Sequence, residues 1–180
     1  MLRGIIAGMA LAVAIAVIVG YLIVRSGAIP ANADADAGAL ETWVARTSLH
    51  ATLDREAPKM PNPVSNTEQN LLTGVQLFAR NCAVCHGSAK GDAAASPIAK
   101  GLYQKPPQFA SHGVEDDEEG VSFWKIKHGI RLTGMPAFGL TLNDNDIWTL
   151  ALFLKHMDQL PPNVQQAWQQ VQNWPIASAD

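Results

Sequence analysis

The hydrophobic residues of this chain are concentrated near its amino-terminal end. The stretch from Ile5 to Val24 contains no charged residue, and Arg3 and Arg25 flank it. About twenty apolar residues in a helix span the roughly 30 Å hydrocarbon core of a bilayer. The pattern therefore predicts a transmembrane helix within residues 1–25.

A cleaved secretory signal is the alternative interpretation of this stretch. The sequence Ala31-Asn32-Ala33 resembles a small-residue cleavage site. The apolar part of a signal peptide has about 7–15 residues, however, and this one is longer. We therefore expect an uncleaved anchor. Because an arginine stands on each side, charge bias hardly decides which end faces the cytoplasm.

Residues 26–66 are expected to form a linker that contains one helix. From Leu40 to Ala57 the apolar residues recur at helical spacing, and Pro58, Pro61 and Pro63 end the pattern. The apolar face of this juxtamembrane helix has two interpretations, which remain open. It either docks on a transmembrane subunit of a partner or belongs to a solvated stalk. The face consists of Leu40, Trp43, Val44, Thr47 and Ala51.

A second helical pattern lies near the carboxyl end. The residues from Asn143 to Asp146 supply capping side chains and negative charge for a helix start, and Pro161-Pro162 is expected to end the helix. Apolar residues cover most of its circumference, which predicts burial on two sides. They are Ile147, Trp148, Leu150, Ala151, Leu152, Phe153, Leu154 and Met157.

Residues 161–180 form an expected tail with one more short helix between Asn163 and Trp174. Its apolar face either covers the preceding domain or binds a partner, and the sequence does not separate the two. That face consists of Val164, Ala167, Trp168, Val171 and Trp174.

Composition narrows the class of protein. Thirteen Lys and Arg against sixteen Asp and Glu give a net charge of −3, whereas a nucleic-acid-binding protein normally has a basic excess. Two cysteines, three positions apart, exclude a disulfide framework. The carboxylates of Glu115–Glu119 form either a solvated loop or a docking patch for a basic redox partner.

The two cysteines belong to the sequence Cys82-Ala83-Val84-Cys85-His86. Two thiols one helical turn apart can both reach the vinyl groups of one haem, and the next residue is then placed beneath the iron. C-x-x-C-H is the attachment signal of c-type haem. A redox-active dithiol would follow a strand, and no strand pattern precedes this segment. A zinc site would need a second ligand pair, but the remaining candidates, His112, His128 and His156, are scattered.

A methionine between Gly134 and Pro136 is the candidate for a second iron ligand. Met135 lies in a segment that cannot continue a helix, so a loop can present its thioether. Met60, in the proline-rich connector, and Met157, at the end of the apolar helix, are the alternatives. A lone methionine most often fills a core.

These motifs together resemble the class I c-type cytochromes, in particular the bacterial, membrane-anchored kind with one haem. The resemblance covers about Thr67 to Leu160. It rests on Gly74 and Phe78 in LLTGVQLFARNC, on Phe153 in LALFLK, on CAVCHG and on GMPAF. It implies an all-α cytochrome c domain over residues 67–160, wrapped around one covalent haem c. Implied site residues are Cys82 and Cys85 as thioethers, with His86 and Met135 as axial ligands.

The resemblance also implies a proline carbonyl that holds the proximal histidine through a hydrogen bond, which orients the ring and raises its basicity. We expect Pro97 in this role, with Pro106 and Pro107 as rivals. Expected donors to the haem propionates are Trp124, Arg131 and Tyr103.

The expected function is one-electron transfer by a membrane-tethered cytochrome of a bacterial respiratory chain, free-standing or as a subunit of a larger oxidoreductase complex. Because His/Met ligation saturates the iron, we expect a carrier and not an enzyme. The alternative is a haem enzyme, such as a peroxidase or a gas-handling protein, with an open iron position. Thioether attachment occurs outside the cytoplasm, so the haem domain is expected to face the periplasm from the inner membrane. The expected partner is a membrane-bound redox complex or a periplasmic redox protein, and no nucleic acid.

Overall fold

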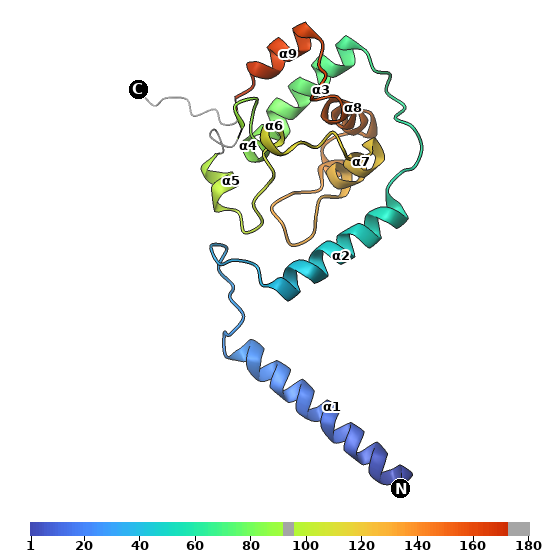
Figure 1. Ribbon diagram of the computed structural model, residues 1–180, viewed down its shortest axis with the longest axis vertical. Coiled ribbons are helices and arrows are strands. Elements are labelled where there is room, and N and C mark those ends of the chain that lie inside the picture. The colour runs from blue at the N-terminus through green and yellow to red at the C-terminus, as the bar shows by residue number, and fades with distance from the viewer. Residues whose placement is uncertain (92–95, 173–180) are drawn as a thin grey trace. The chain divides into compact units, whose positions relative to one another are not determined.

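The computed structural model describes residues 1–91 and 96–172, and this part of the chain is helical without a strand. The contacts between residues divide the chain into two compact units, Met1–Asp36 and Ala37–Asp180. The α-helices labelled in Figure 1 are α1 (Leu2–Arg25), α2 (Ala39–Glu56), α3 (Glu68–Asn81), α4 (Ala83–His86), α5 (Pro97–Gly101), α6 (Phe109–His112), α7 (Glu119–His128), α8 (Asp144–Lys155) and α9 (Pro162–Gln169). A short 3₁₀ helix, η2 (Phe138–Leu140), lies between α7 and α8 in the sequence.

The first unit is built on α1, which confirms the predicted apolar helix. It has 24 residues, a mean hydropathy of 2.6 in its most apolar window and no buried residue. At 1.5 Å per residue it is about 36 Å long, enough to cross a bilayer core. Among the described residues it is the one helix with this length and composition.

The second unit is organised around the crossing of α3 and α8 (Figure 1). Gly74 lies at the crossing, where a Cβ atom would lie 2.5 Å from the Phe153 Cβ and 2.9 Å from the Thr149 carbonyl oxygen. The absence of a side chain at this position lets the two helices approach closely. Phe78 and Phe153 are fully buried beside the crossing, with ring centroids 5.7 Å apart.

Both central helices begin at the capping residues that their sequences provide. The Thr67 side chain accepts a hydrogen bond from the Asn70 amide at 3.2 Å, and the Asn143 side chain accepts one from the Asp146 amide at 2.9 Å. The end of α8 differs from the prediction, because the helix stops at Lys155 and not at the prolines. Met157 is buried in the turn that follows.

Helices α7 and α9 cover two sides of this centre. Phe123 of α7 stacks on Trp148 of α8, with ring centroids 4.2 Å apart. Trp168 of α9 packs edge-on against Phe78 at 5.3 Å. The tail helix therefore covers the domain, which decides between the two interpretations of its apolar face. Trp174 lies outside the described residues.

The linker helix α2 belongs to the second unit and packs on α7. Leu53 and Ala57 are buried there, and the Pro58 carbonyl fills the space that a side chain on Gly120 would need. The Asn62 side chain then donates hydrogen bonds to Glu119 at 2.8 Å and to the Trp148 carbonyl at 3.0 Å. Residues 53–62 are thus part of the folded domain's surface.

Candidate haem site

The two cysteines and His86 lie on one helical turn. α3 ends at Asn81, and the amides of Cys85 and His86 both donate to the Cys82 carbonyl, at 3.0 and 2.9 Å. Gly87, at φ +81°, ends this turn with a backbone conformation that favours glycine. The C-x-x-C-H motif is therefore presented as a single rigid turn at the end of a core helix.

Both cysteines are free thiols. Burial raises the pKa of the Cys82 thiol to about 12, and the neighbouring Cys85 adds to the effect. Burial also raises the pKa of Cys85. A redox-active dithiol has the opposite property, a lowered thiol pKa. No group of three or more metal-ligating side chains occurs in the described part of the chain, so a zinc site lacks ligands there.

The ring of His86 is held by a backbone carbonyl. Its Nδ1 atom lies 3.0 Å from the Pro107 carbonyl oxygen. Because a carbonyl oxygen only accepts hydrogen bonds, Nδ1 carries the proton and Nε2 keeps its lone pair. Burial lowers the pKa of His86, and the bond to Pro107 partly offsets this. The other support is the Phe109 ring, stacked on the imidazole at 4.3 Å.

The proline that holds His86 is Pro107, so the expectation of Pro97 was wrong. Pro97 is the first residue of α5, and the Ser96 side chain caps that helix through the Ala99 amide. A proline at this position starts a helix, and its carbonyl is directed along the helix axis. Ser96 also donates to the Val84 carbonyl, which ties α5 to the attachment turn.

Gln108 supports this arrangement, and sequence reasoning missed it. The side chain is buried, and its amide donates to the Cys85 carbonyl at 2.8 Å and to the Pro106 carbonyl at 3.2 Å. It therefore fastens the loop that carries Pro107 to the turn that carries His86. A glutamine after two prolines does not form a recognisable motif, so this role could not be predicted from the sequence.

Met135 lies in a loop that follows α7 and is closed by its own hydrogen bonds. The Ile130 amide donates to the Met135 carbonyl at 3.2 Å, and the Met135 amide donates to the Thr133 hydroxyl at 3.1 Å. The Met135 side chain is half-buried against the core. Met60 is 59% exposed, and Met157 is a core residue.

The donor set fits a c-type haem. Two unpaired thiols stand one turn apart, and the adjacent imidazole offers Nε2 because Nδ1 is occupied. A family model described as "Cytochrome C oxidase, cbb3-type, subunit III" matches residues 69–154. This segment is a class I c-type cytochrome domain. Neither a curated protein nor a solved structure matches the chain. A c-type cytochrome domain behind an apolar helix of membrane-spanning length fits a membrane-tethered electron carrier.

The three residues expected at the haem propionates occupy different places in the cytochrome domain. The Tyr103 hydroxyl donates to the Glu41 carboxylate of α2 at 2.8 Å. Trp124 is half-buried, and its ring lies 5.0 Å from that of His128. Arg131 is exposed on the methionine loop, beside Leu132, whose φ is +61°. Their role at the haem propionates stays a prediction.

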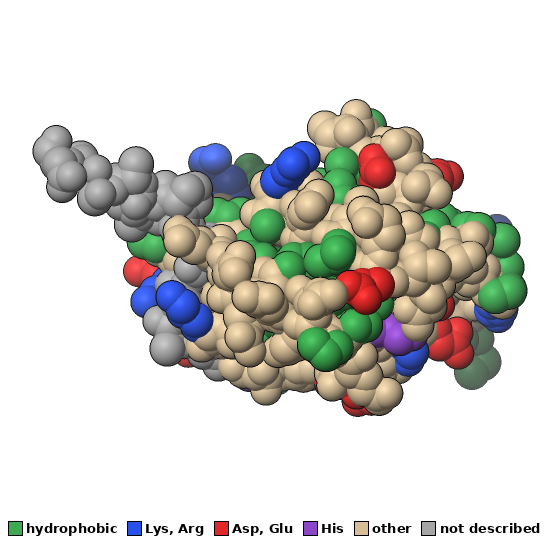
Figure 2. All heavy atoms as spheres, turned by 90° about the horizontal axis from the view of Figure 1, so that it is seen from above, with side chains coloured by type: hydrophobic (Ala, Val, Ile, Leu, Met, Phe, Trp, Pro, Cys, Tyr) green, Lys and Arg blue, Asp and Glu red, His purple; other side chains and the backbone are tan. Residues whose placement is uncertain are grey.

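Some carboxylates of the acidic run Glu115–Glu119 make contacts within the cytochrome domain itself. Asp117 forms an ion pair with Lys125 at 2.6 Å, and the Glu119 carboxylate accepts the hydrogen bond from Asn62. Glu115 accepts a hydrogen bond from the Val114 amide at 2.6 Å. Acidic and basic side chains both occur on the face seen in Figure 2, and neither kind forms a continuous patch there.

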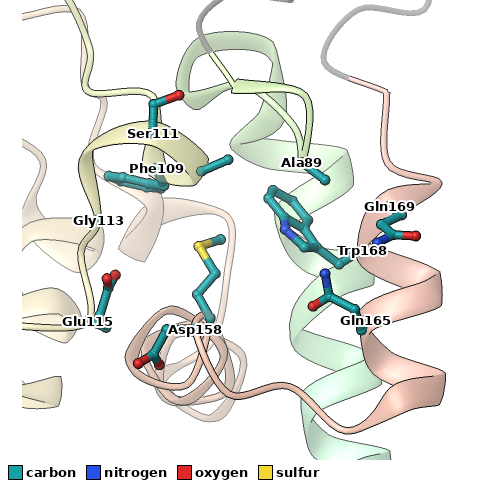
Figure 3. Close-up of a pocket in the computed structure, with 11 residues that line it drawn as sticks. Ala89, Phe109, Ser111, Gly113, Glu115, Asp158, Gln165, Trp168 and Gln169 are labelled. Atoms are coloured by element: carbon teal, nitrogen blue, oxygen red, sulfur yellow. The ribbon is translucent and has the colours of Figure 1, made fainter.

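A cavity of about 360 Å³ lies between α6 and α9, on the side of the domain shown in Figure 3. Its walls include Phe109, Met157 and Trp168, whereas Cys82, His86 and Met135 are not among them. The cavity is therefore separate from the attachment turn, and Phe109 stands between it and His86.

Proposed function

We propose that this protein is a membrane-tethered one-electron carrier with one haem c, held by thioethers to Cys82 and Cys85. His86 and Met135 are its axial ligands. The observation that carries the proposal is the hydrogen bond from His86 to the Pro107 carbonyl, which leaves Nε2 as the ligand atom beside two free thiols. The haem, when bound, supplies an iron that cycles between the ferrous and ferric states.

The chain's own residues favour a carrier over a haem enzyme. The sequence has two cysteines and one C-x-x-C-H motif, which provides for one haem. A thioether on the second axial position occupies the site that a peroxidase or gas-binding protein keeps open, and it raises the reduction potential. Met135 is half-buried on a closed loop, which suits a second iron ligand. Met60 is exposed and Met157 belongs to the core, so both suit this role less well.

The proposed location is the periplasmic face of a bacterial inner membrane. Thioether attachment of haem occurs outside the cytoplasm, which supports a periplasmic position for the cytochrome domain. The proposed partner is a membrane-bound redox complex or a periplasmic redox protein. The description of the matching family, an oxidase subunit, supports a role beside a respiratory complex.

Met135→Ala tests the ligand assignment. We expect the ferric protein to lose the weak far-red charge-transfer band of Met-ligated haem and to bind added cyanide readily. Met60→Ala is the matched control and should keep the band, because Met60 is exposed in the connector. A band that persists in Met135→Ala, or that disappears in Met60→Ala, would contradict the assignment.

Haem staining after denaturing electrophoresis tests covalent attachment. The colour should travel with the polypeptide, and Cys82→Ala or Cys85→Ala should weaken its retention. Extraction of the haem from the unmodified protein by acidified organic solvent would refute the proposed attachment.

A further inference from the structure

Helix α2 has two faces with different surroundings. The face turned toward the domain contains buried Leu53 and half-buried Leu49 and Thr42. The other face begins with Leu40, Trp43 and Val44, whose exposed fractions are 73%, 64% and 50%. At about 100° per residue these two sets lie on opposite sides of the helix. The three exposed residues, called here the outer face of α2, therefore point away from the domain.

Contacts near both ends of α2 keep the outer face directed outward. Near the carboxyl end, Leu53 and Ala57 are buried, and the Pro58 carbonyl packs against Gly120 of α7. Near the amino end, the Glu41 carboxylate accepts the hydrogen bond from Tyr103. A rotation of α2 that buried its outer face would break both sets of contacts. The exposed tryptophan and leucine are thus a fixed feature of the domain's surface.

The tether to α1 keeps the outer face near a bilayer. Thirteen residues, 26–38, separate the end of α1 from the start of α2. A flexible chain of this length has an end-to-end distance of about 20 Å. If α1 crosses a membrane, the first turns of α2 stay on average at about that distance from the lipid surface, and even a fully extended linker holds them within about 45 Å of it. The lipid surface is therefore the neighbour that the chain itself keeps within reach of the outer face.

We propose that the outer face of α2 inserts into the headgroup region of the membrane that α1 crosses, and so fixes the orientation of the haem domain. This inference rests on the proposed function, because it requires α1 to span the bilayer. Tryptophan is enriched at the membrane interface, where an amphipathic helix buries its apolar face about 5–10 Å deep. The nearby charges, Glu41 and Arg46, balance each other, and Asp34 and Asp36 precede the helix. The surface therefore suits zwitterionic lipid and needs no anionic headgroup.

Nitroxide accessibility in nanodiscs tests this docking. The full-length, haem-loaded protein is placed at one chain per phosphatidylcholine nanodisc, with the haem reduced. Single nitroxides are attached to Val44→Cys on the outer face and to Ala45→Cys, an exposed neighbour about 100° around the helix. A third label on Val13→Cys reports whether α1 lies in the bilayer. We expect the label at position 44 to be protected several-fold from a water-soluble nickel chelate, relative to position 45.

The labels separate the failure of this inference from the failure of the proposed function. If the label at position 13 is protected and those at 44 and 45 are equally accessible, the docking is refuted and the anchor stands. If the label at position 13 is accessible to the chelate, the proposed anchor itself fails. Protection at position 44 that appears only in native membranes would assign the outer face to a partner protein and overturn the inference. Protection that requires two chains in one disc would assign the outer face to a second copy and would overturn the inference as well.

Discussion

The Gln108 side chain joins two backbone segments that would otherwise be independent. Its bonds to Cys85 and Pro106 hold the Pro107 carbonyl against His86. A carbonyl in this position increases the electron donation of a histidine to its metal. The strength of that effect depends on how firmly the carbonyl is placed, and Gln108 supplies the placement.

Gln108→Leu should therefore change both stability and reduction potential. The substitution leaves two carbonyls unpaired, which costs about 1–3 kcal/mol in the free energy of unfolding. Because the His86 hydrogen bond loosens, the histidine donates less to the iron and the reduction potential rises. Spectroelectrochemical titration measures this shift. Gln104→Leu, an exposed change in the same loop, is the control. If the variant is destabilised but its reduction potential is unchanged, Gln108 stabilises the fold without influencing His86, and the prediction is wrong.

The sequence was sufficient to predict the attachment turn but not the residue that supports it. Cys82, Cys85 and His86 lie within five consecutive positions, so one helical turn brings them together. Pro107 lies 21 positions from His86, and only the path of the intervening chain decides that it, and not Pro97, reaches Nδ1. Counting residues gives no information about that path.

At the level of elements, the close crossing of α3 and α8 depends on the glycine at position 74, which has no side chain. Gly74→Ala would place a methyl group 2.5 Å from the Phe153 Cβ and 2.9 Å from a backbone oxygen, so the helices must separate. We expect a loss of about 1–3 kcal/mol in the free energy of unfolding, measured by denaturant titration. Gly101→Ala, where nothing lies within 4 Å of the added Cβ, should be neutral or slightly stabilising. Equal midpoints for the two variants would contradict the close crossing.

The positions of α1, α2, α8 and α9 were predictable from periodicity, whereas the face that α2 turns to the domain was not. The stripe from Leu40 to Ala51 correctly indicated a helix, but the domain packs on Leu53 and its neighbours instead. Periodicity identifies an apolar face without naming what covers it. Similarly, α8 ends at Lys155, where His156 turns its Nδ1 to the Leu152 carbonyl at 2.9 Å, before the prolines are reached.

At the scale of the whole molecule, the segment before α3 contributes to the folded domain. A fragment that begins at Ala37 keeps Leu53, Ala57 and the hydrogen bonds of Asn62 to α7 and α8. A fragment that begins at Ser65 loses all of these. Both should carry haem with the same spectrum, because neither truncation touches the attachment turn.

The longer fragment should nevertheless be more stable by about 1–3 kcal/mol, the range expected when a buried carbonyl such as that of Trp148 loses its partner. Urea titration of the two fragments measures the difference. Asn62→Ala in the longer fragment is the matched variant, and it should account for part of the loss. Identical unfolding midpoints would show that residues 37–64 only rest on the surface.

The closed methionine loop has a consequence for the speed of electron transfer. The Ile130 amide donates to the Met135 carbonyl, and the Met135 amide donates to the Thr133 hydroxyl. The backbone of Gly129 lies so close that an added Cβ there would be 2.7 Å from the Met135 carbonyl oxygen. If Met135 is the iron ligand that we propose, this fixed backbone would keep its thioether in place in both oxidation states. Groups that are already in position need not rearrange when charge moves. We therefore expect a small reorganisation energy for the proposed haem centre, and fast self-exchange between oxidised and reduced copies of the protein.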